Sequence, residues 1–189
     1  NSDFNGVAGK ELVTYAKSGS SDGRKQLADQ TVTYAGTDST AKPEETFKGG
    51  ETLYFPTVAA PITVSYNLSG VKDLKLSPDV LAGIMQAEIT TWNDPKIAAD
   101  NEGVTLPNTP IVVVHRSDGS GTTNNFTKFL VAAAPTAWKL GSGDTVNWPA
   151  GTQGAEKNSG VAQLIKQTAG GVGYVDLADA AKAGLTFAS

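Results

Sequence analysis

The sequence predicts an α/β fold with a largely parallel sheet. Short segments rich in β-branched and aromatic residues alternate with segments of helical periodicity along the 189 residues. Helix starts are marked by capping residues, such as Ser77 followed by Pro78, and the 21 glycines cluster in a few short loops. Because parallel strands are joined by crossover connections, this alternation predicts helices that flank the sheet.

The first third of the chain contains two short segments that predict strands. They are residues 11–16 and 31–35, and they lie on either side of a helix expected at residues 23–29. The longer apolar stretch 53–68 is rich in β-branched and aromatic residues, so we expect a further strand there, interrupted by two prolines.

The remainder of the chain alternates helices and strands more clearly. A helix is expected from Ser77 and another near residues 93–99, with Asn93 as its cap. In a helix at residues 123–133, an apolar face is expected from Phe126, Phe129 and Leu130. The other expected elements are strands at 111–114 and 172–175 and helices at 159–168 and 177–183.

Composition excludes several classes of protein. The net charge is −4 and the longest basic run is Arg24-Lys25, so a nucleic-acid partner is not expected. The absence of cysteine excludes disulfides, thiolate catalysis and cysteine-based zinc sites. No apolar run approaches the roughly 18 residues of a membrane span. The chain starts at Asn1 rather than Met, so we expect a processed or truncated product.

Two loops share one design, a strand followed by a short Gly/Ser run and a helix. They are residues 18–23 and residues 116–122. The first turn of a helix leaves backbone N–H groups unpaired, and the helix dipole makes that end partly positive. Glycine allows close approach to a ligand, and serine and threonine hydroxyls add donors. Two such loops facing each other are expected to surround a tetrahedral oxyanion.

Three charged residues refine this expectation. Arg116 can bind two oxygens of an anion, and Asp118, two residues later, can hold the guanidinium in place. Asp38 ends the second expected strand, where ligand sites in open α/β sheets lie. An ionised carboxylate accepts hydrogen bonds and cannot donate them, so Asp38 favours a protonated oxyanion such as hydrogen phosphate over sulfate.

The run from Arg116 to Thr122, followed by its apolar helix, resembles the signature of the phosphate-binding proteins of bacterial ABC-type phosphate uptake. The pattern of residues 15–38 is similar to that family, and the resemblance extends from Glu11 onward. It implies a two-lobed periplasmic-binding-protein fold with a cleft between the lobes, here incomplete at both ends. Residues 1–61 would then be part of the first lobe and residues 62–189 the second. Further matching segments are residues 53–68, 89–95, 147–149 and 170–175.

The resemblance also implies roles for individual residues. Ser20 would donate to phosphate, Asp38 would accept its proton, and Arg116 would bind the anion while Asp118 holds it. Further donors would be Ser120, Gly121 and Thr122, with Gly19, Ser21 and Gly119 as secondary candidates. No catalysis, metal or other cofactor is implied. The expected partners are inorganic phosphate and a membrane ABC permease, and the expected location is periplasmic or extracellular, with a lipid anchor in a full-length form.

A serine hydrolase is the main enzymatic alternative. Residues 19–23 fit the Gly-x-Ser-x-Gly nucleophile pattern, with Ser20 as nucleophile and Asp38 and His115 as partners. His115 is expected to point away from Arg116, since side chains alternate along a strand, and so to be structural. A phosphotransferase is disfavoured because no Gly-x-x-x-x-Gly-Lys run occurs. Asp38 and Asp118 alone are too few ligands for a metal.

A third alternative is a family relative with a structural or interaction role and weak or no phosphate binding. If strands are missing from the first lobe, the edges of its sheet are exposed and invite pairing with another chain. This alternative predicts a complementary chain or self-association through these edges.

Overall fold

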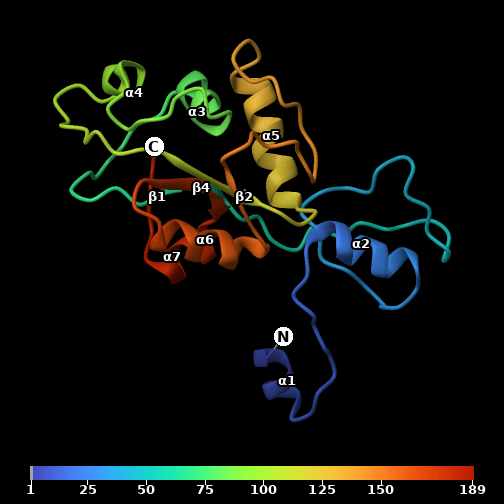
Figure 1. Cartoon of the computed structure of the whole chain (residues 1–189). Coiled ribbons are helices and arrows are strands. Elements are labelled where there is room, and N and C mark those ends of the chain that lie inside the picture. Colours follow the sequence, from blue (N-terminus) through green and yellow to red (C-terminus); the bar gives the residue numbers. More distant parts are fainter. Residues whose placement is uncertain (1) are drawn as a thin grey trace.

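The computed structural model describes residues 2–189 and has the α/β architecture that the sequence predicts. In the described residues α1 and α2 precede β1, α3 and α4 follow it, and strands and helices alternate from β2 onward (Figure 1). In chain order the elements are α1 (Ser2–Ala8), α2 (Ser20–Ala28), β1 (Ile62–Tyr66), α3 (Pro78–Met85), α4 (Pro95–Asp100), β2 (Val112–Arg116), α5 (Gly121–Ala133), β3 (Gln153–Ala155), α6 (Lys157–Gln167), β4 (Gly171–Asp176), α7 (Leu177–Ala183) and β5 (Thr186–Phe187).

The described strands form one five-stranded sheet in the order β3-β2-β4-β1-β5. The strand β2 pairs in parallel with β3 and β4, whereas β1 pairs antiparallel with β4 and β5. The sheet is therefore mixed rather than largely parallel. The reason is that β2, β3 and β4 follow one another through helical crossovers, whereas β1 enters the sheet from the preceding extended segment and is not constrained in direction.

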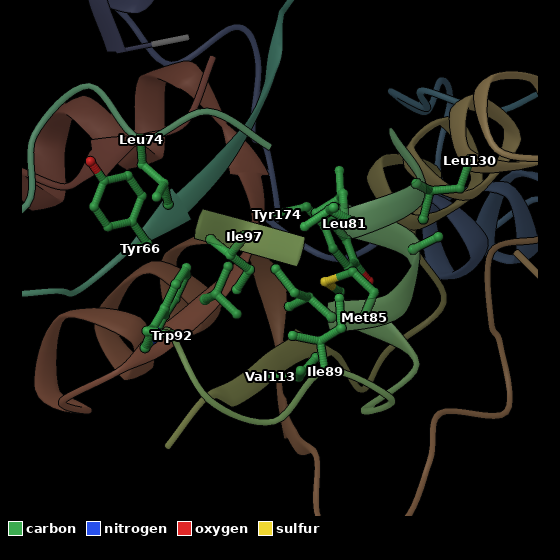
Figure 2. Packing of buried hydrophobic residues seen from close by; sticks show 14 of the residues in the cluster. Tyr66, Leu74, Leu81, Met85, Ile89, Trp92, Ile97, Val113, Leu130 and Tyr174 are labelled. Carbon is green, nitrogen blue, oxygen red and sulfur yellow. The ribbon is translucent and has the colours of Figure 1, made fainter. Parts of the chain in front are cut away.

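Alternating side chains of the central strands separate two hydrophobic layers. Val113 and Tyr174 face a large core that also contains Trp92 and residues of α3, α4 and α5 (Figure 2). The next residues, Val114 and Val175, face a smaller core with α6 and α7. This period of two places α3, α4 and α5 on one face of the sheet and α6 and α7 on the other (Figure 1).

The expected strands in the first third of the chain are not formed. Residues 11–16 and 31–35 pair with no strand among the described residues, and of the stretch 53–68 only residues 62–66 join the sheet. A cavity of about 320 Å³ lies between residues 12–16 and residues 32–36. A strand exists only through hydrogen bonds to a neighbour, so β-propensity alone does not make these segments into strands.

Several expected helix boundaries also shift. The helices α2 and α5 begin at Ser20 and Gly121, inside the two Gly/Ser loops, rather than after them. The cap of α4 is Asp94, which accepts a hydrogen bond from the Lys96 N–H, and not Asn93. Phe129 is half exposed, so its assignment to the apolar face was wrong. The buried stripe of α5 contains Phe126, Thr127 and Leu130, and Phe129 lies one residue, about 100°, off it.

Candidate functional site

The starts of α2 and α5 meet, although they are far apart in the sequence. The backbone N–H of Ser21 donates to the carbonyl of Gly119 over 3.3 Å. A Cβ on Gly121 would lie 2.6 Å from Ser20 Oγ and 2.7 Å from Asp38 Cβ. Both distances are too short for van der Waals contact, so only glycine permits this approach. The structure thus brings the two loops singled out in the sequence into direct contact.

The guanidinium of Arg116, at the end of β2, is held in one orientation. Its Nε donates to Asp118 Oδ1 over 2.6 Å and its Nη2 to Asp118 Oδ2 over 2.5 Å, which confirms the expected pairing. Asp118 Oδ1 also accepts from the backbone of Lys157. Burial by itself raises the pKa of Asp118, but the bonds from Arg116 and Lys157 lower it overall, so the carboxyl stays ionised and the fork stays fixed.

Asp38 lies against the start of α5. Its backbone N–H donates to Ser20 Oγ over 3.3 Å, and its carbonyl accepts from the Asn125 amide over 2.7 Å. Its carboxylate Oδ2 accepts from the Thr122 hydroxyl over 3.5 Å. Asp38, Ser20 and Thr122 are therefore brought together as the sequence led us to expect.

Ser120 has a structural task in addition to the donor role expected of it. Its side-chain oxygen accepts from the Thr123 backbone N–H over 3.1 Å and so caps α5. Ser120 is fully buried. The cap fixes the first turn of α5, whose free N–H groups are those expected to bind an anion.

Sequence reasoning missed Asp176 and Asn158. Asp176, the last residue of β4, accepts from the Thr122 hydroxyl over 3.4 Å and from the Asn158 amide. Asn158 also accepts from Arg116 Nη1 over 3.4 Å. Burial, together with the charge of Asp38, raises the pKa of Asp176. Its position at the carboxyl end of a central strand was the signal that could have identified it.

His115 does not take part in this constellation. Its Nδ1 lies 2.9 Å from the Arg116 carbonyl and its Nε2 lies 3.1 Å from the Thr152 hydroxyl. Its ring stacks on Trp148 with a centroid distance of 4.8 Å. With both nitrogens engaged by these groups, His115 is not hydrogen-bonded to Ser20, and it has the structural role expected of it.

The part of the chain that the structure describes, residues 2–189, contains neither a metal cluster nor a membrane-spanning helix. No group of three or more His, Cys, Asp or Glu side chains there could hold a metal ion. Within the same part of the chain, no helix is both long enough and apolar enough to cross a membrane.

Comparison with known proteins gives a consistent result. The family model of the PBP superfamily domain matches residues 3–189. The phosphate-binding protein PstS 2 of Mycobacterium tuberculosis is 39% identical over 169 residues, which cover 86% of this chain and 45% of the relative. The phosphate-binding protein PstS of Pasteurella multocida is 39% identical over 181 residues, which cover 94% and 52%. The chain thus spans about half the length of these curated relatives.

Solved structures of phosphate-binding proteins have a similar fold. The periplasmic phosphate-binding protein PfluDING, bound with phosphate, superposes with a TM-score of 0.71 at 26% identity, covering 86% of this chain and 49% of that one. A putative phosphate ABC transporter substrate-binding protein of Clostridium perfringens gives a TM-score of 0.74 at 19% identity, covering 100% and 68%. The second likeness supports the fold alone.

Proposed function

Because this chain belongs to the PBP superfamily, we infer that it binds inorganic phosphate without transforming it, for delivery to a membrane ABC importer. The observation that carries this conclusion is the convergence of two helix starts, those of α2 and α5, beside the guanidinium of Arg116. Unpaired N–H groups, hydroxyls and a fixed guanidinium are together suited to a tetrahedral oxyanion.

Each group has a defined task in this proposal. Arg116 provides charge and paired N–H donors, and Asp118 keeps it oriented. Ser20, Gly121 and Thr122 donate from the helix starts, together with Ser120, whose hydroxyl proton is not used by the cap it makes. Close to the same ligand we place Gly19, Ser21 and Gly119 as secondary contacts.

Asp38 supplies the selectivity. An ionised carboxylate beside an anion is unfavourable unless the anion brings a proton to share. Hydrogen phosphate carries such a proton at neutral pH and sulfate does not. The site should therefore accept phosphate and reject sulfate through a single carboxylate.

The names of the relatives support this function and its context. Both are phosphate-binding proteins, and a phosphate-bound structure has the same fold. We accordingly place the protein in the periplasm or outside the cell, with a lipid anchor in a full-length form, and assign it no catalytic role. We further propose that residues 1–61 and 62–189 belong to two different lobes, with the ligand held between them.

A role in protein interaction is the second candidate, and one observation favours it. Large apolar side chains of the first 61 residues are exposed, including Leu53, Phe55 and Val58. Such side chains on extended segments are suited to pairing with another chain. This candidate predicts self-association or a complementary chain in place of tight phosphate binding.

Calorimetric titration with phosphate and, separately, with sulfate tests the proposed function. We expect micromolar or tighter binding of phosphate and no response to sulfate. The Arg116→Ala variant is the negative control, and its phosphate binding should be much weaker than that of wild type. If neither anion binds to the wild-type protein, the proposal that this chain binds phosphate is wrong. A mass above 19.5 kDa in solution would then favour the interaction role.

A further inference from the structure

Arg24 and Asp144 form a buried ion pair across 120 positions of the sequence. Arg24 Nη2 lies 2.5 Å from Asp144 Oδ2, and both side chains are only 3% exposed. We propose that this pair is a positioning device that keeps the starts of α2 and α5 in contact before any ligand arrives. The proposal rests on the proposed function in one respect, since the two helix starts are the phosphate site.

The Arg24 side of the pair organises the segment that carries Asp38. Arg24, in α2, donates to both carboxylate oxygens of Glu45, over 2.9 and 3.0 Å. Its Nη1 donates to the Ser39 hydroxyl over 2.7 Å. Because Ser39 follows Asp38 directly, Arg24 fixes α2 and the Asp38 segment to each other. These protein partners occupy the guanidinium, so Arg24 is not itself available as an anion ligand.

The Asp144 side organises the start of α5. Its Oδ1 accepts from the Asn124 amide over 3.0 Å, and its backbone carbonyl accepts from the Ser120 N–H over 3.0 Å. Its Oδ2 also accepts from the Ser21 hydroxyl over 2.9 Å. Asp144 therefore bonds to Arg24 and Ser21 of α2 and to Ser120, which caps α5.

Because the ion pair is buried, the loss of either partner is unfavourable. Charges inside a protein are poorly screened by salt, and removing one partner leaves the other buried without compensation. Burial alone raises the pKa of Asp144, but bonds from Arg24 and Ser21 and the charge of Arg24 lower it overall. Asp144 thus remains ionised at neutral pH, and the attraction persists in the absence of ligand.

The consequence for binding follows from the fraction of molecules in which the starts of α2 and α5 are in contact. The apparent dissociation constant equals the intrinsic constant divided by the fraction of binding-competent molecules. Loss of the pair lowers this fraction and leaves the donors of the site in place. Affinity should fall by one factor for every oxyanion that binds, so selectivity should not change. This separates the role of Asp144 from that of Asp38.

The experiment compares wild type, Asp144→Asn and Lys25→Ala by small-angle scattering without ligand and by titration with phosphate and arsenate. Lys25→Ala is the control, because it removes an exposed ion pair with Asp29 on the same helix. We expect Asp144→Asn to have a larger radius of gyration without ligand and to bind both anions about tenfold more weakly, with an unchanged ratio. The control should match wild type.

Unchanged scattering and affinity in Asp144→Asn would overturn the proposal, as would a loss of one anion and not the other. Arg24→Lys keeps the charge but cannot hold Glu45, Ser39 and Asp144 at once. It should therefore be intermediate, and it tests the pair if Asp144→Asn does not fold. If wild type binds no phosphate while the variant still expands, the positioning device stands and the proposed function fails.

Discussion

Asp38 and Asp176 accept from the same hydroxyl, since Thr122 Oγ1 lies 3.5 Å from Asp38 Oδ2 and 3.4 Å from Asp176 Oδ1. One hydroxyl has one proton, so it can satisfy only one of the two carboxylates at a time. Asp176 also accepts from the Asn158 amide, so Asp38 is the carboxylate left to accept from a ligand when Thr122 donates to Asp176. This competition gives the two acids different properties that can be tested separately.

Asp38→Asn should reduce the preference for phosphate over sulfate. The amide keeps the shape of the side chain and removes the negative charge that repels an anion without a proton. We expect weaker phosphate binding and measurable sulfate binding by calorimetry. Asp22→Asn, at an exposed position in the first turn of α2, is the control for charge alone. If the ratio of phosphate affinity to sulfate affinity is the same in Asp38→Asn and wild type, Asp38 does not have its proposed role.

Asp176→Asn should alter the pH dependence of the free energy of unfolding. Burial raises the pKa of Asp176 above its ordinary value of 3.8, so in the pH window above 3.8 the folded protein binds more protons than the unfolded chain. The contribution of Asp176 to stability therefore falls as pH rises through that window. The variant lacks this loss, so its stability should fall less than that of wild type between about pH 4 and about pH 7.

Denaturant unfolding at several pH values measures this difference. Asp79→Asn is the control, because Asp79 is an exposed carboxylate in the first turn of α3. Asp118 and Asp144 have lowered pKa values, and their contributions are lost only as pH falls below 3.8, outside the window. Parallel pH profiles for wild type and Asp176→Asn would contradict the prediction.

The sequence predicts local features well and distant pairings poorly. Arg116 and Asp118 are two residues apart on one loop, so their pairing could be foreseen, as could the existence of α5 from its periodicity. The bond between Arg24 and Asp144 joins residues 120 positions apart. No local sequence pattern distinguishes these two buried residues from the exposed charged residues of the chain, and only the packed structure identifies them.

The extended segments at residues 11–16 and 31–35 show the same limit in the fold. Their composition is typical of strands, but neither forms one, because no described strand lies beside them to accept their hydrogen bonds. The strands β2 and β4 have similar composition and become strands because they pair with each other. Strand formation is thus a property of two segments, and composition describes only one of them.

Arg116→Ala should weaken phosphate binding by about 2–5 kcal/mol, because it removes a buried charge partner of the anion. It also leaves Asp118 half-buried beside the site without its cation, which adds repulsion. Arg116→Lys keeps the charge but lacks the planar fork that bonds both oxygens of Asp118, so it should recover only part of the affinity. Equal affinity for the lysine variant and wild type would show that charge alone is required.

Gly121→Ala should separate the two helix starts. A Cβ at this position would lie too close to the Ser20 hydroxyl, the Asp38 side chain and the Ser39 backbone, and the backbone cannot yield as a side chain could. Alanine is otherwise the better helix former, so any loss of stability or affinity must come from this collision. We expect weaker phosphate binding and a lower free energy of unfolding, measured by titration and by denaturant.

Gly160→Ala is the matched control, because Gly160 lies inside α6 and a Cβ there would meet Ala155 at an ordinary contact distance of 3.5 Å. This control should be neutral or slightly more stable, by up to about 1 kcal/mol, and should bind phosphate as wild type does. The contrast between two helical glycines separates helix propensity from contact between the loops. If Gly121→Ala behaves as Gly160→Ala does, the starts of α2 and α5 do not need to touch for binding, and the ligand is held by Arg116 and α5 alone.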